Sequence, residues 1–258
     1  MFRKNYLYLS VVILFFSSPS FSTEFIVPED LKTFNSSTYN ALPLSVEADY
    51  LLKQNGNITK LLDESLAIAN KYGIEEYFGF RLAHRHHDLS ENEVMVEQFE
   101  NLSTGPALIT SVKKETSTEE RTPASWLYTS SGLKVFEYST DPQVKELYNK
   151  LMFNTSFFEE IRQVSLRLQL DQILAPAILG RQHFQHFNAE QPLYEQINAG
   201  IYASILINKP VEEIEKEKMI GGLIQTSWGL SSHKFPILCV THCRYSDAEY
   251  RFHEYYHN

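Results

Sequence analysis

Hydrophobic and polar positions change their period several times along the chain, and each change marks an expected element. Residues 23–56 show no sustained period, so we expect them to be irregular or partly extended. From Asn57 or Thr59 to Gly73, apolar residues recur at helical spacing, which predicts a helix. Residues 77–87 then alternate, which predicts a strand. One face of that strand is expected to carry Phe78, Phe80, Leu82, His84 and His86.

Shorter alternating runs and two helix starts follow. Strands are expected around 94–99, 107–113, 124–130 and 133–138. Asp141 before Pro142 predicts a helix with an N-cap and a proline in its first position. Ser156, with Glu159 three residues on, predicts a second helix that starts with a capping box. Its apolar stripe consists of Phe157, Ile161, Val164 and Leu168.

The last third of the chain returns to strand-like runs. They cover 201–207, 222–228 and 235–243, and residues 250–257 are able to pair back onto the last of them. The order is therefore helix, strands, two helices, strands. It predicts a single α+β domain with a mainly antiparallel sheet and a central pair of helices.

Residues 1–22 have the pattern of a secretory signal peptide. Arg3 and Lys4 precede an apolar run over 6–16, and Ser20-Phe21-Ser22 offers a small-x-small cleavage site. The run is shorter than the roughly 20 residues that a bilayer span needs. We expect a mature chain of 23–258 without a transmembrane anchor, exported to the periplasm or the outside by a bacterium, or through the secretory pathway of a eukaryote.

Charge narrows the choice of partners. The chain has 23 Lys and Arg against 32 Asp and Glu, a net charge of −9. Signal cleavage removes Arg3 and Lys4 and no acidic residue, which brings the charge to −11. Nucleic-acid binding depends on cations that neutralise phosphates, so we expect no nucleic-acid partner. Other partners are not indicated.

His84 and His86 are the main candidate metal ligands. Side chains two residues apart on a strand project from the same face about 6.6 to 7 Å apart, so both rings can approach one metal. Imidazole suits zinc and other divalent transition metals. A third ligand has to come from elsewhere, and the candidates are His242, His253, His257 and Cys243 near the C-terminus, or Glu93 and Glu97 on the return strand. Glu93 or Glu97 is also the candidate base beside a bound metal. The alternative is that these histidines only hydrogen-bond their neighbours at the edge of the core.

Cys239 and Cys243 are the two cysteines of the chain. In an extended segment their Cα atoms lie about 13 Å apart, which excludes both a disulfide and joint binding of one metal ion. Cys243 stands beside Arg244, where a cation lowers a thiol pKa, so it is a candidate nucleophile for a Cys–His enzyme. Burial as small apolar side chains is the alternative for both.

Two resemblances involve the histidine segment. Gly79, His84, His86 and Glu91 resemble part of the first cupin motif, which implies a cupin-like barrel as the alternative fold. The segment Gly-x-x-Leu-x-His-Arg-His at 79–86, followed by Asn-Glu-x-x-Val-Glu at 92–97, resembles a segment found in a family of uncharacterised proteins. This resemblance implies no activity.

Three functional hypotheses follow. The first is an exported metal-binding protein or metal-dependent enzyme that uses the His-x-His pair. The second is a non-catalytic secreted interaction or effector protein, since the chain lacks the Gly-x-Ser-x-Gly, Walker, Gly-x-Gly-x-x-Gly and His-Glu-x-x-His motifs. The third is a thiol enzyme. Whether the protein is an enzyme stays open at this point.

Overall fold

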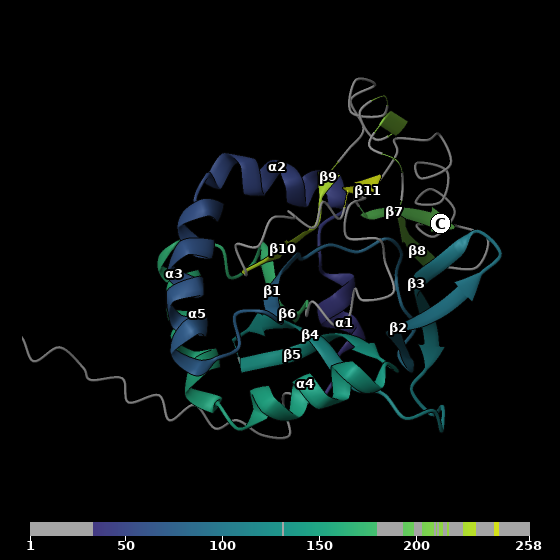
Figure 1. Cartoon of the computed structure of the whole chain (residues 1–258), viewed down its shortest axis with the longest axis horizontal. Helices are drawn as coiled ribbons and strands as arrows, with labels where there is room; N and C mark the ends of the chain where they lie inside the picture. Colours follow the sequence, from purple (N-terminus) through teal and green to yellow (C-terminus); the bar gives the residue numbers. More distant parts are fainter. Residues whose placement is uncertain are drawn as a thin grey trace, which may run out of the picture.

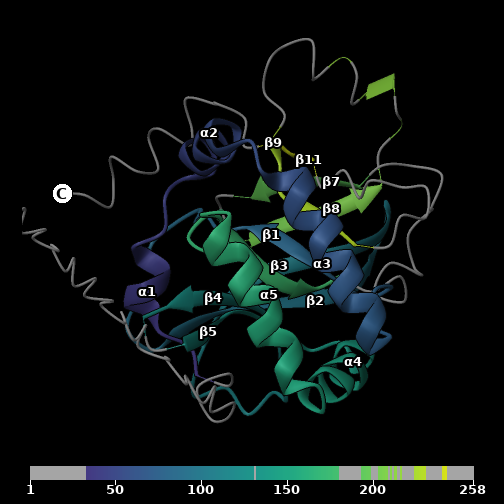
Figure 2. The same cartoon turned by 90° about the vertical axis from the view of Figure 1, so that its left-hand side faces the viewer.

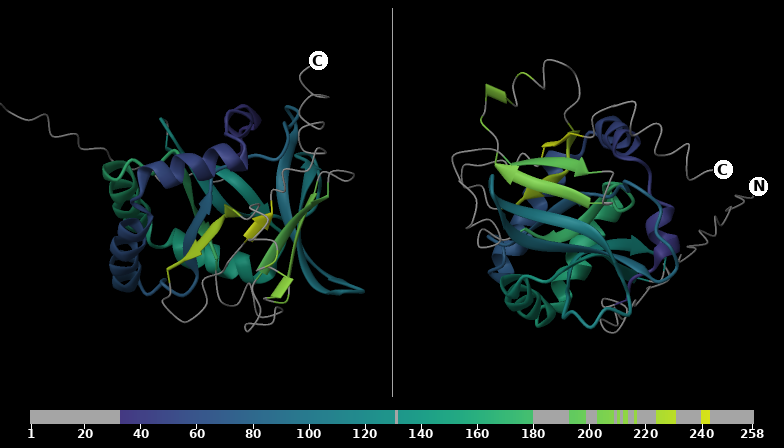
Figure 3. Two further views of the ribbon diagram at one scale, coloured as in Figure 1. Left: turned by 90° about the horizontal axis from the view of Figure 1, so that it is seen from above. Right: turned by 90° about the vertical axis from the view of Figure 1, so that its right-hand side faces the viewer.

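The computed structural model describes residues 33–130, 132–179, 193–198, 203–208, 224–230 and 240–242, with Pro210, Glu212, Glu213 and Lys216. These residues form a mixed α and β structure with a curled sheet (Figures 1 and 3). The helices are α1 (Ser36–Asn40), α2 (Ser45–Asn55), α3 (Ile58–Tyr72), α4 (Pro142–Met152) and α5 (Thr155–Arg167). The strands are β1 (Phe78–Leu82), β2 (Glu93–Leu102), β3 (Gly105–Lys114), β4 (Thr122–Thr129), β5 (Gly132–Ser139), β6 (Leu174–Ile178), β7 (Leu193–Asn198), β8 (Ala203–Asn208), β9 (Ile224–Gln225), β10 (Ser227–Gly229) and β11 (Val240–His242).

The sheet is mainly antiparallel, as the sequence predicts. Its strand order is β10-β1-β6-β4-β5-β2-β3-β8-β7-β11-β9. Among the described strands only two pairs, β2 with β5 and β7 with β11, are parallel. The order has two ends, and no pairing within the described residues joins β10 to β9. The described strands therefore do not close into the cupin-like barrel.

Helices α3, α4 and α5 cover one face of the sheet. α3 and α5 run side by side, and α4 packs against β4 and β6 (Figures 1 and 2). Within the described part of the chain, no helix has both the length and the apolar character needed to cross a membrane.

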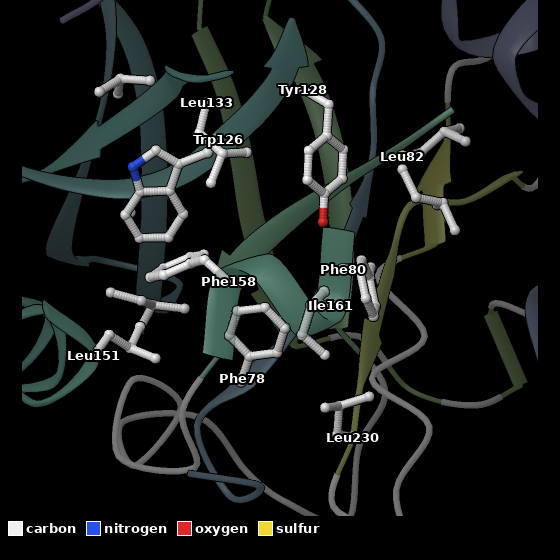
Figure 4. Packing of buried hydrophobic residues seen from close by; sticks show 14 of the residues in the cluster. Phe78, Phe80, Leu82, Trp126, Tyr128, Leu133, Leu151, Phe158, Ile161 and Leu230 are labelled. Atoms are coloured by element: carbon white, nitrogen blue, oxygen red, sulfur yellow. The ribbon is translucent and has the colours of Figure 1, made fainter. Parts of the chain in front are cut away.

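The main core lies between these helices and the sheet, and aromatic rings fill much of it. Phe158 of α5 lies between Trp126 of β4 and Phe78 of β1 (Figure 4). Its ring centroid is 5.3 Å from that of Trp126, and Phe78 meets Phe157 edge-on at 4.6 Å. Edge-to-face pairs of this kind are the favoured aromatic geometry in protein cores. The predicted stripe on α5 is confirmed, because Phe157, Ile161, Val164 and Leu168 are all buried.

Local signals predicted two helices well. α3 follows Asn57 and ends at Gly73, whose φ of 67° is the left-handed conformation that glycine adopts readily. α4 has Asp141 as its N-cap, and the side chain accepts a hydrogen bond from the Gln143 amide. The capping box at Ser156 is wrong: Asn154 is the N-cap of α5, and Ser156 lies inside the first turn.

Three predictions fail where contacts distant in sequence decide the structure. Residues 36–40 and 45–55 are helical rather than irregular, although α2 buries few apolar side chains, mainly Ala48 and Leu52. The strand predicted over 77–87 ends at Leu82, because the chain then turns to bond with residues 42–44. β6 was missed because Pro176 argues against a strand in the middle of a sheet.

Pro176 is accommodated by its register. It lies opposite Phe80 of β1. Ala83 N donates to Ile173 O, and Leu179 N donates to Tyr77 O, so both of these residue pairs are hydrogen-bonded. Hydrogen-bonded and non-hydrogen-bonded pairs alternate along an antiparallel ladder, so Phe80 and Pro176 form a non-hydrogen-bonded pair. The Pro176 nitrogen therefore points away from β1 and towards β4, whose pairing with β6 is limited to Ser125 and Ala177.

Candidate functional site

A small cavity lies on the face of β1 opposite the main core. Phe78 and Phe80 point into that core, and Arg81, between Phe80 and Leu82, points to the other side, because successive strand residues alternate. The cavity has a volume of about 50 Å³. One water needs roughly 10–15 Å³ on this measure, whereas sites for drug-sized ligands run to about 300–1,000 Å³. The space suits a few waters or a hydrated ion.

The cavity wall is rich in polar side chains from separate elements. Its charged and imidazole groups are those of Arg81, His84, His86, Glu97 and Glu137. Its hydroxyl groups are those of Tyr39, Thr110, Ser204, Thr226 and Ser227. Strands β1, β2, β3, β5, β8 and β10 all contribute, so the curl of the sheet brings together groups that are far apart in sequence.

Arg81 joins two carboxylates at this wall. Its Nη2 lies 2.8 Å from Oε2 of Glu97, which has no exposed side-chain surface, and its Nη1 pairs with Glu137. Ser125 Oγ donates a further hydrogen bond to Glu137 Oε2 at 3.2 Å. One guanidinium between two carboxylates leaves the group with a net charge of −1 when all three are ionised.

His84 and His86 meet at the same wall, although they follow β1 rather than belong to it. Their ring centroids are 4.7 Å apart at an interplanar angle of 85°. His84 Nδ1 lies 2.8 Å from the Leu82 carbonyl oxygen. A carbonyl only accepts, so Nδ1 carries the proton, and a neutral His84 ring has its lone pair on Nε2. The two rings therefore lie close together, but they do so from the loop after β1 and not from the strand that the sequence predicts.

The two candidate bases lie in different places. Glu97 is at the cavity. Glu93, the first residue of β2, does not line it: its Oε2 accepts a hydrogen bond from the Ser90 amide at 2.8 Å, in the turn before the strand. Four residues of strand separate the two, or about 13 Å.

The C-terminal candidates are only partly described. His242 belongs to β11, where its backbone pairs with Gln196 of β7. Its side chain, together with Cys239, Cys243, His253 and His257, lies outside the described residues. Within the described part of the chain, no group of three or more His, Cys, Asp or Glu side chains is arranged to hold a metal ion.

The residues behind the cupin resemblance have separate positions. A Cβ on Gly79 would lie 2.2 Å from the Trp228 carbonyl oxygen, so this glycine allows β10 to approach β1 closely. Glu91 is exposed in the turn before β2 and does not line the cavity.

Glu137 is the main site residue that the sequence did not indicate. A signal was present, because Glu137 interrupts the apolar run of β5 between Phe136 and Tyr138, and charged residues are rarely buried without a partner. The partner, Arg81, lies 56 residues away. No family model, no curated protein and no solved structure matches the chain, so its function has to be argued from this cavity.

Proposed function

We propose that the protein is exported and binds a divalent transition metal, zinc in the first place, in this cavity. His84 and His86 are the first ligands, and His242 or His253 completes the set. In this proposal residues 1–22 are a signal peptide, and 23–258 form one α+β domain with α4 and α5 as its central pair of helices.

The hydrogen bond from His84 to the Leu82 carbonyl carries the proposal. Histidines that bind metals commonly donate their second ring N–H to a backbone carbonyl or a carboxylate, which fixes the tautomer and the ring orientation. His84 has this arrangement through Nδ1, and the nitrogen that a metal would use is Nε2.

The distance between the two rings also supports a shared metal. Two imidazoles that bind one tetrahedral zinc at about 2.0–2.1 Å have centroids roughly 5 Å apart. The observed separation is 4.7 Å. Binding would require one nitrogen of each ring to face the same point, and the rings now stand at 85° to each other.

Electrostatics and solvent exclusion favour a chemical role for Glu97 over Glu93. Glu97 is buried at the cavity and held by Arg81, whereas the Glu93 side chain bonds to the turn before β2. A bound zinc lowers the pKa of a water molecule, and a carboxylate beside it is suited to orient that water and accept its proton. If the protein is a metal-dependent enzyme, we assign the base to Glu97.

The two alternative functions have less support. If the protein were a non-catalytic interaction protein, we would expect no polar cavity. A cavity lined by both histidines is present. The Cys–His enzyme depends on Cys243, which lies outside the described residues, and no observation on the described part favours it.

Elemental analysis of the purified mature chain tests the proposal. We expect about one zinc per chain in the wild type and its loss in His84→Ala and His86→Ala. His87→Ala is the matched control, because His87 is as buried as His84, at 7% exposure, belongs to the same run of histidines and does not line the cavity. Circular dichroism checks that each variant is folded. A wild type without metal, or equal metal in all four proteins, would overturn the proposal.

A further inference from the structure

The loop that carries the two histidines is tied to the end of α1 and the residues that follow it, 39–43. The Arg85 amide donates to the Pro43 carbonyl at 3.0 Å, and Arg85 Nε donates to the Leu42 carbonyl at 2.9 Å. Asn40 makes a reciprocal pair with Leu89: its Nδ2 donates to Leu89 O and its Oδ1 accepts from Leu89 N, both at 2.8 Å. Four hydrogen bonds therefore fasten residues 85–89 to residues 40–43.

Arg85 is placed between the two histidines, and this position explains their orientation. Side chains alternate along an extended segment, and Arg85 forms a bridge with Leu44 as a strand residue would. When the Arg85 side chain is drawn towards Leu42, the side chains before and after it are directed to the opposite side. The cavity lies on that side, and both His84 and His86 line it.

The same segment also covers the cavity. Tyr39 lines it with only 2% of its surface exposed, and its ring stacks on Phe136 of β5 at 5.9 Å. The residue that covers the site and the residues that hold its histidine loop are thus neighbours in sequence. Docking of residues 39–43 against the sheet orders both at once.

We propose that Asn40 and Arg85 are positioning residues, which hold the 83–89 loop so that His84 and His86 face one point in the cavity. This inference rests on the proposed metal site. It extends that site to groups that do not touch the metal.

The chemistry of the two side chains makes the inference specific. Arg85 Nε donates to Leu42, and Nη1 pairs with Asp88 at 2.6 Å. A lysine would keep the charge beside Asp88 but has no N–H at the place of Nε to donate to Leu42. Asn40→Asp keeps the oxygen that accepts from Leu89 N and loses the amide that donates to Leu89 O. Both changes are conservative in size.

Zinc affinity, measured by competition with a chromophoric chelator, is the first readout. We expect Arg85→Gln and Asn40→Asp to bind zinc about 10- to 100-fold more weakly than the wild type, the usual cost of losing a group that supports a ligand. The zinc affinity of Arg85→Lys should lie between those of Arg85→Gln and the wild type. Asp88→Asn is the matched control, since it removes the ion pair of Arg85 and leaves the bond to Leu42; its affinity should stay within about threefold of the wild type.

The tautomer of His84 in the metal-free protein is the second readout, followed by long-range ¹H–¹⁵N NMR. The wild type should show a protonated Nδ1, and Arg85→Gln and Asn40→Asp should show a mixture of both tautomers. If the wild type binds no zinc but the tautomer changes as expected, the metal site is wrong and the positioning role stands. Wild-type affinity and an unchanged tautomer in both variants would overturn the positioning role.

Discussion

The two faces of β1 show how one strand serves two purposes. Phe78, Phe80 and Leu82 point into an aromatic core against α5, where most of the buried side chains are apolar. Arg81 points the other way, to two carboxylates and the histidine pair. Apolar burial contributes directly to stability, whereas a buried ion cluster contributes little net free energy, because desolvation offsets the attraction between charges. The stability of the fold therefore comes from the first face, which is why we place the chemistry on the second.

The largest expected effect comes from emptying the aromatic core. Phe158→Ala removes a ring that contacts both Trp126 and Phe78, and it should lower the free energy of unfolding by about 4 kcal/mol. Phe153→Ala is the control, because Phe153 is 89% exposed and its loss should cost less than about 0.5 kcal/mol. Urea denaturation measures both. Equal costs for the two variants would contradict the packing described for this face.

The polar face should respond through its charges. Arg81→Met removes the guanidinium that pairs with the buried Glu97 and the partly buried Glu137, and we expect the free energy of unfolding to fall by about 3 kcal/mol. Adding Glu97→Gln and Glu137→Gln to the same chain removes the stranded charges and should recover most of the loss. Urea denaturation of the single and triple variants measures this. A triple variant no more stable than Arg81→Met would show that Arg81 acts through packing instead.

A smaller effect is expected at Gly79, where β10 approaches β1 closely. A Cβ there would lie 2.2 Å from the Trp228 carbonyl oxygen and 2.7 Å from Leu179 Cδ1. Gly79→Ala should therefore displace β10 and cost about 1–3 kcal/mol in thermal or urea unfolding. Since Ser227 of β10 lines the cavity, zinc affinity should fall as well. Unchanged stability would mean that β10 is not held against β1.

The smallest expected effect is a loss of stability at alkaline pH. Burial raises the pKa of Tyr138 from 10.0 to about 12, so above pH 10 the unfolded chain releases a proton that the folded chain keeps. Stability should fall as the pH rises from about 10 towards 12, by about 1 kcal/mol at pH 11 for this residue. Urea unfolding of Tyr138→Phe should show a correspondingly weaker loss between pH 9 and pH 11. An identical pH dependence in both proteins would exclude Tyr138 as a contributor.

The comparison of the two faces also explains what the sequence predicts and what it does not. α3, α4 and the β4–β5 hairpin follow from local signals, such as the stop at Gly73 and the proline after Asp141. The end of β1 at Leu82 and the strand through Pro176 depend on segments at 42–44 and on β4, which no local pattern reveals.

The site was predictable to a similar extent. The His-x-His spacing predicts that His84 and His86 lie close together, and Glu97 is a candidate base on the next predicted strand. Glu137 and the positioning role of Asn40 depend on pairings between residues 49 and 56 positions apart, and short-range periodicity carries no information on such pairs.

The most direct test of the metal site is the zinc-dependent change in the free energy of unfolding, in the wild type and in His86→Ala. A ligand that binds only the folded state at a hundredfold excess over its Kd stabilises it by about 2.7 kcal/mol. We predict this gain for the wild type and none for His86→Ala, with little difference between the two metal-free proteins, because His86 lies outside the aromatic core. An equal gain in both proteins, or no gain in the wild type, would contradict a metal site at His84 and His86.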